Sequence, residues 1–89
     1  MENKLAIIAI VIDKCEEKVI ENVNSLLHEY RDIIVGRMGI PYKERQISLM
    51  SVMVDGPEDR INSLSGKLGM ISYVSVKTTY SNQKKWILI

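Results

Sequence analysis

The sequence predicts an α+β domain with a ferredoxin-like βαββαβ sandwich, in which a four-stranded antiparallel sheet carries two helices on one face. The main observation is a repeat. IVIDKCEEKV (10–19) and VMVDGPEDRI (52–61) share one plan, in which an apolar strand leads through an aspartate, two linking residues and an acidic residue into a helix. Each stretch stands inside a strand–helix–strand unit, and two such units in tandem are typical of this fold.

The first half begins with an apolar run, KLAIIAIVI (4–12), which is typical of a buried strand. Asp13 and Glu16 form a capping-box pattern, which predicts the start of a helix. Apolar residues then recur at helical spacing from Val19 to Tyr30, with polar residues between them. This pattern indicates an amphipathic helix of about four turns.

Two further strands are predicted at 32–40 and 46–54, joined by the polar turn YKER (42–45). Right-handed crossovers place the first and third strands at the centre of the sheet and the second and fourth at its edges.

The second helix follows the third strand. Pro57 suits its first turn, and Gly69 suits its C-terminal cap. The last strand is predicted at 72–80. The apolar stripe of the helix consists of Ile61, Leu64 and Leu68.

The first strand is apolar on both of its faces. Leu5, Ile7, Ala9 and Val11 alternate with Ala6, Ile8, Ile10 and Ile12. Two helices cover one face of the sheet only, so the other face should be polar if it meets water. An apolar second face predicts a homo-oligomer, either a dimer or a tetramer. The alternative is that small residues such as Ala6 and Ser51 leave this face wet and only mildly apolar. The interface candidates are Ile7, Ile8, Met38, Met50 and Trp86.

The C-terminal end has a different character. We assign residues 1–80 to the domain and 81–89, SNQKKWILI, to an apolar tail. Four apolar residues at a chain end are unfavourable to expose, at roughly 1.5–3 kcal/mol each. We therefore expect Trp86 to pack on a neighbouring subunit and to strengthen the oligomer. The alternative is a disordered or aggregation-prone end.

Composition excludes several classes of function. The chain has 12 Lys and Arg residues against 11 Asp and Glu residues. It therefore lacks the excess of basic residues that a general nucleic-acid binder would show. The chain has no Phe, and its third strand has no aromatic residue on which an RNA base could stack. No apolar run reaches the roughly 20 residues of a membrane span, and a single cysteine fits a reducing compartment. We expect a cytoplasmic protein with neither nucleic acid nor membrane as a partner.

Catalysis and metal binding have no candidate constellation in the sequence. Cys15 and His28 are the only residues of their kinds, and one predicted helix separates them by about 20 Å, too far for a shared metal site. Cys15 at a helix N-terminus would be activated, but the neighbouring Asp13, Glu16 and Glu17 oppose this effect. The sequence predicts no enzyme, no metal and no cofactor, with a redox role for Cys15 as the alternative. Cys15 and His28 are otherwise expected to be an ordinary first-turn residue and a surface or interface residue.

GRMG (36–39), in the second strand, permits two interpretations. Glycine in an edge strand marks a bulge or a close backbone approach, and Pro41 protects such an edge from pairing. Glycines also bare the backbone for a ligand, and Arg37 offers a planar fork to a carboxylate. Strict alternation would place Arg37 on the face of Val35. The ligand-binding candidates are Gly36, Arg37 and Gly39.

A family resemblance rests on three stretches: DIIVGRMGIPYKERQISLMSVMVDG (32–56), INSLSGKLG (61–69) and VSVKT (74–78). Together they resemble a small stand-alone family of regulators of the iron-only hydrogenase system in anaerobic bacteria. The resemblance spans about residues 4–80. It implies a ferredoxin-like fold close to regulatory ACT domains and to the C-terminal domain of the nickel-responsive repressor. It also implies dimers or tetramers built through the sheet.

The resemblance implies a non-enzymatic regulatory or ligand-sensing module with a small-molecule effector or a protein partner. Two departures narrow this expectation. Amino-acid-binding ACT domains carry Pro-Gly where this chain has Lys14-Cys15, and the strand histidines and ribbon-helix-helix segment of the nickel sensor are missing. An amino-acid effector, nickel binding and direct DNA contact are therefore not expected. The alternative function is a ligand-free interaction domain that serves hydrogenase maturation or expression.

Overall fold

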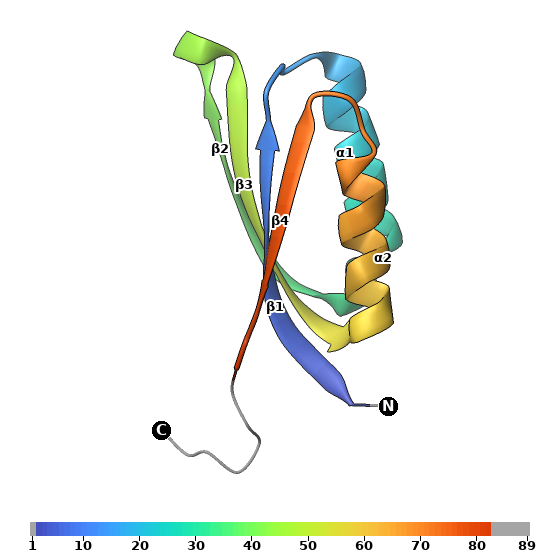
Figure 1. The fold of residues 1–89 in the computed structure, drawn as a ribbon. Helices are drawn as coiled ribbons and strands as arrows, with labels where there is room; N and C mark the ends of the chain where they lie inside the picture. The colour runs from blue at the N-terminus through green and yellow to red at the C-terminus, as the bar shows by residue number, and fades with distance from the viewer. Residues whose placement is uncertain (1, 83–89) are drawn as a thin grey trace.

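The structure of the protein is a computed structural model, which describes residues 2–82. The sheet lies on one side and the two helices pack side by side on one of its faces (Figure 1). Single turns of 3₁₀ helix at Arg31–Ile33 and Lys43–Arg45 join the larger elements. The elements, in chain order, are β1 (Asn3–Ile12), α1 (Glu17–Glu29), β2 (Ile34–Tyr42), β3 (Ile47–Pro57), α2 (Glu58–Gly69) and β4 (Val74–Tyr80).

The strand order is β2-β3-β1-β4, and every pairing is antiparallel. β1 pairs with β3 along its whole length, from Asn3 opposite Pro57 to Ile12 opposite Ser48. The predicted βαββαβ fold class is confirmed, with the first and third strands at the centre of the sheet.

The core lies between the sheet and the helices. The even-numbered residues of β1 face the helices, and Ile8, Ile10 and Ile12 are almost completely buried there. This is the apolar periodicity of a strand meeting that of two amphipathic helices. The helices contribute Val19, Val23 and Leu27 from α1, and Ile61, Leu64 and Leu68 from α2.

The helix ends differ from those predicted. α1 begins at Glu17 after an extended Glu16, so the Asp13 capping box is wrong. The backbone N–H of Asp13 donates instead to the carbonyl of Tyr73 at 2.7 Å, which ties the end of β1 to the loop before β4. Residues 13–16 are used to carry the chain from the sheet to the helix layer.

The ends of α2 also need correction. Pro57 is the extended N-cap residue and still belongs to β3, so it does not lie in the first helical turn. Gly69 is the last helical residue, and Met70 follows it as the C-cap in a right-handed conformation. The helix therefore ends without the left-handed glycine cap that the sequence predicts.

Gly56 marks a close approach of β3 to the turn after α1. A Cβ atom at Gly56 would lie 2.7 Å from Cγ2 of Ile33, closer than van der Waals contact allows. Because Ile33 is itself buried, its branched side chain has little room to move.

A β-bulge interrupts β2 at the start of GRMG. The register shifts between Ile34 and Gly36, so that Val35 is the additional residue opposite β3. A bulge at the glycines was one of the two interpretations, and it is confirmed beside Gly36, whereas Gly39 is regularly paired with Met50. The bulge also reverses the alternation, because one inserted residue moves every later side chain to the other face. Arg37 consequently stands opposite Val52 on the helix side of the sheet, and its predicted placement on the face of Val35 is wrong.

Candidate functional site

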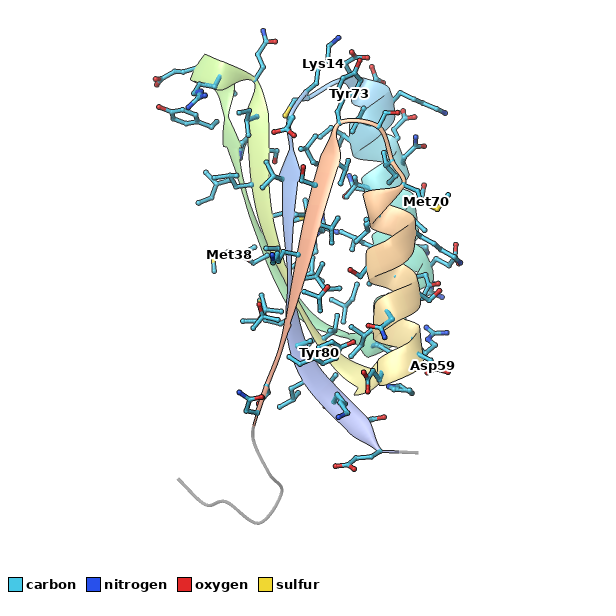
Figure 2. All side chains as sticks on the ribbon, in the orientation of Figure 1. Lys14, Met38, Asp59, Met70, Tyr73 and Tyr80 are labelled. Carbon is cyan, nitrogen blue, oxygen red and sulfur yellow. The ribbon has the colours of Figure 1, made fainter. Side chains whose placement is uncertain are left out.

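The face of the sheet that the helices leave uncovered is apolar, and we call it the open face. In Figure 2, Met38 projects from this face, away from both helices. Of the exposed large hydrophobic residues among those described, only Met70 and Tyr73 lie elsewhere. The others are Leu5, Ile7, Val35, Met38, Ile40, Tyr42 and Leu49.

Four of the five interface candidates lie within the described residues, and the fifth lies outside them. Ile7 is 49% exposed and Met38 is 64% exposed, both on the open face. Ile8 is completely buried under the helices, and Met50 packs against the same core. Ile8 is therefore not available to a partner, whereas Met50 is only partly buried and lines one of the two hollows described below. Trp86 and the tail beyond residue 82 lie outside the described residues.

The open face is hollowed at two places and is polar along one margin. One hollow, of about 340 Å³, includes Leu5, Ile7 and Val35 in its lining, and the other, of about 230 Å³, includes Met38 and Ile40. The margin formed by β4 carries the exposed residues Ser75, Lys77 and Thr79. The apolar surface is therefore centred on β1, β3 and β2.

A second surface lies between α1 and the start of β2, and we call it the Arg37 pocket. It has a volume of about 530 Å³. Nη2 of Arg37 donates a hydrogen bond of 2.9 Å to Oδ1 of Asn24, which fixes the guanidinium beside α1. The pocket is lined by Asn24, Leu27, His28, Arg31, Ile34 and Arg37.

The Arg37 pocket carries cationic groups without acidic ones in its lining. The ion pairs among residues 2–82 join Lys4 to Glu58, Lys14 to Glu16, Arg60 to Asp32 and Lys67 to Glu29. None of these pairs uses Arg31 or Arg37. Within residues 2–82, the guanidinium of Arg31 donates a hydrogen bond of 3.0 Å to the carbonyl of His28.

Sequence reasoning identified one residue of this pocket as a ligand candidate. Arg37 is part of the lining, whereas Gly36 and Gly39 are not. A Cβ atom at either glycine would make ordinary contacts of 3.7 Å with a methionine methyl group on β3. Asn24 and Arg31 were missed, because only the fold brings them beside Arg37.

Cys15 and His28 lie in different surroundings. Cys15 is exposed and free, and it precedes the first turn of α1 in which it was predicted. Its backbone N–H donates to the carbonyl of Gln46 at 3.0 Å. His28 lies in the last turn of α1 and lines the Arg37 pocket. Within residues 2–82, no group of His, Cys, Asp and Glu residues is arranged to hold a metal ion.

A separate polar cluster joins the two helices around Tyr30. The guanidinium of Arg60 lies 4.9 Å from the centre of the Tyr30 ring, and the ammonium of Lys67 lies 5.3 Å from it. The hydroxyl of Tyr30 shares a 2.8 Å hydrogen bond with Ser63. The pKa of Tyr30 is lowered, chiefly by Lys67 and then by Ser63, while Tyr30 raises the pKa of Lys67. We interpret this cluster as a structural link between α1 and α2.

The helices within the described part of the chain are all too short or too polar to cross a membrane.

A solved structure shares most of this architecture. The uncharacterized protein TM1266 from Thermotoga maritima is 38% identical in sequence, and the match covers 89% of this chain and 98% of that one. Its TM-score of 0.86 indicates the same fold over the matched part of the chain.

Two more distant structures share the fold alone. A formyltetrahydrofolate deformylase from Pseudomonas putida KT2440 is 13% identical, with a TM-score of 0.64, over 90% of this chain and 30% of that one. The C-terminal domain of the MgtC protein from Mycobacterium tuberculosis is also 13% identical, with a TM-score of 0.63, over 88% and 87% of the two chains. No curated protein matches the sequence.

The model of a protein family matches residues 4–78. This range contains both helices and all four strands, apart from the first residue of β1 and the last two residues of β4. This family is described as "TM1266-like: Iron-only hydrogenase system regulator, putative". The extent of this match, together with the 38% identity to TM1266 itself, shows that the chain is a member of the TM1266-like family.

Proposed function

We propose that the protein is a non-enzymatic, cytoplasmic regulatory module of the iron-only hydrogenase system, and that it acts as a homo-oligomer assembled through the open face. The description of the family as a regulator supports the regulatory and non-enzymatic parts. The single, unpaired Cys15 supports a reducing compartment. The exposed apolar surface of the sheet is the one observation that carries the assembly.

The size of the open face suits a stable interface. A four-stranded sheet with a central strand of 10 residues has a face of roughly 600 Å² in projection, from a strand spacing of about 4.8 Å and a rise of about 3.3 Å per residue. Side-chain relief increases the accessible area of such a face. The total approaches the roughly 800 Å² that each partner buries in a typical stable complex.

The same face favours a second copy of the chain as its occupant. It offers apolar side chains beside apolar hollows, so two copies related by a two-fold axis can place the projections of one near the hollows of the other. A dimer is the simplest closed assembly that covers this face. A tetramer requires a further contact, for which the exposed edge strand β2 is available.

Two methionines provide a matched test. Met38 lies on the open face and is 64% exposed, whereas Met70 follows α2 away from that face and is 86% exposed. Met38→Glu should shift the wild-type oligomer toward the monomer, and Met70→Glu should leave it unchanged. Multi-angle light scattering over a range of protein concentrations measures both variants. A wild-type chain that is monomeric at tens of micromolar, or an equal response of the two variants, contradicts the proposal.

The second candidate is a ligand-free interaction domain for hydrogenase maturation or expression, in which a different protein covers the open face. The apolar character of the face supports this function equally well. A monomeric wild type in the light-scattering experiment would favour it over self-assembly.

A further inference from the structure

The bulge in β2 determines where Arg37 points. Without the additional residue Val35, the alternation of β2 would direct Arg37 to the open face among exposed apolar side chains. With the bulge, Arg37 lies on the helix side and reaches Asn24 on α1. A bulge interrupts the ladder of hydrogen bonds, and bulges commonly serve to re-aim a side chain beside a binding site.

The Arg37 pocket collects donors of one kind. Arg37 and Arg31 present guanidinium groups, and His28 presents an imidazole on the same lining. The hydrogen bond from Nη2 of Arg37 to Asn24 uses one edge of the guanidinium and orients the rest. The remaining guanidinium N–H groups of Arg37 have no partner among the described residues. A planar fork of this type matches the two oxygens of a carboxylate.

The lining of the pocket also contains apolar groups. Leu27 is 1% exposed and offers almost no surface to a ligand, whereas Ile34 is only partly buried against the core. A ligand with an apolar body would therefore contact Ile34 and the methylene stems of the arginines while its charged end meets their guanidinium groups. Inorganic phosphate would use the cationic groups alone and would gain nothing from this apolar surface.

We propose that the Arg37 pocket binds a small organic carboxylate with an aliphatic body, and that Arg37 holds the carboxylate with support from Arg31 and His28. This inference rests on the proposed regulatory function for its purpose, since it names the chemical class of the effector. Binding and assembly are measured independently, so either proposal can fail while the other holds.

The main competing explanation is that the bulge only keeps a charged side chain off the open face. In that case Arg37 needs no ligand, and its contact with Asn24 merely places a solvated guanidinium. The two explanations differ in whether a carboxylate binds saturably beside α1 and β2.

The test is a ¹H–¹⁵N NMR titration of the full chain with three probes: sodium butyrate, its neutral isostere butanamide, and sodium phosphate at matched ionic strength. Butyrate should shift the signals of residues around Asn24, His28 and Arg37 in a saturable manner. Butanamide should not, because it lacks the charge that the arginines recognise. Phosphate should bind at least several-fold more weakly than butyrate.

Two arginine variants complete the design. Arg37→Gln removes the guanidinium that is proposed to hold the carboxylate. Arg45→Gln removes an arginine of the β2–β3 turn that takes part in none of the ion pairs within residues 2–82. Arg37→Gln should weaken butyrate binding by roughly tenfold or more, the effect of losing a charge-assisted hydrogen bond, and Arg45→Gln should not change it. Arg37 is exposed, so its substitution should leave the chain folded. The NMR spectrum of each variant verifies this directly.

Three results would overturn the inference. They are the absence of a saturable shift with butyrate, an equal loss of affinity in both variants, and binding of phosphate as tight as that of butyrate. Light scattering on the same samples reports the oligomeric state separately.

Discussion

The strongest test of the two faces of the sheet uses one substitution at two neighbouring positions of β1. Ile7 is 49% exposed on the open face, and Ile8 is completely buried on the helix side. We expect Ile7→Glu to produce a folded monomer and Ile8→Glu to produce an unfolded chain. The two variants have the same composition, so only the facing of the side chain distinguishes them.

The cost at Ile8 is set by the stability of the whole domain. A chain of 89 residues has a free energy of unfolding of roughly 4–13 kcal/mol. Ile8→Glu loses about 1.5–3 kcal/mol of side-chain burial and adds several kcal/mol for an unpaired buried charge. The sum removes most or all of the stability.

The cost at Ile7 falls on assembly instead. About half of the side chain remains exposed in the single chain, so covering it contributes about 0.7–1.5 kcal/mol per copy. A symmetric dimer contains two copies, which gives about 1.5–3 kcal/mol before the repulsion and desolvation of two carboxylates are added. At about 1.4 kcal/mol for each factor of ten, Ile7→Glu should weaken the dimer at least 10- to 100-fold.

Circular dichroism with thermal melting reports folding, and light scattering against concentration reports assembly. The reasoning is refuted if Ile7→Glu associates as tightly as the wild type. It is equally refuted if Ile8→Glu melts cooperatively at the wild-type temperature.

The remaining predictions concern single features of the chain. Gly56→Ala should lower the free energy of unfolding by about 1–3 kcal/mol in urea denaturation, because its Cβ would overlap Ile33; an unchanged value would show that Ile33 can move. Cys15→Ser should change stability by less than about 0.5 kcal/mol and leave the oligomeric state unaltered, since the residue is exposed; a larger loss in urea denaturation would give this thiol a structural role. Truncation after Tyr80 should weaken the oligomer if Trp86 packs on a neighbouring subunit. An identical light-scattering profile and melting temperature would exclude that role of the tail.

The sequence predicts the order of elements and the centre of the sheet correctly, because these depend on long patterns. Within the run at 4–12, every residue from Leu5 to Ile12 is apolar, so both faces of this strand are apolar. The crossover rule then places the strand beside the third strand. The helix ends depend on single contacts and are predicted less well. Asp13 fails as a cap because its backbone is engaged by Tyr73, 60 residues further along the chain.

The candidate site shows the same limit more sharply. A bulge adds one residue to a strand, and the local sequence around Val35 is compatible both with a bulge and with regular pairing. Strict alternation therefore assigns Arg37 to the wrong face. Asn24 and Arg31 carry no motif, so their convergence on Arg37 depends on how the fold places α1 and the turn after it beside β2. The chemical class of the ligand could be inferred from the arginine at position 37. The pocket around this arginine could not be inferred from the sequence.

The bulge also places the two proposed surfaces on consecutive residues of one edge strand, and this has a thermodynamic consequence. Met38 belongs to the open face, while Arg37 belongs to the pocket on the opposite side. An interface that fixes the backbone at Met38 also restricts Arg37, so less conformational entropy remains to be lost when a carboxylate binds. Butyrate should accordingly bind the assembled wild type more tightly than the monomeric Met38→Glu variant, as measured by the same NMR titration. Linkage requires the reciprocal effect, in which butyrate strengthens assembly by the same factor. Equal affinities for the two proteins would show that the surfaces are independent, and a carboxylate could then not regulate this protein through its assembly.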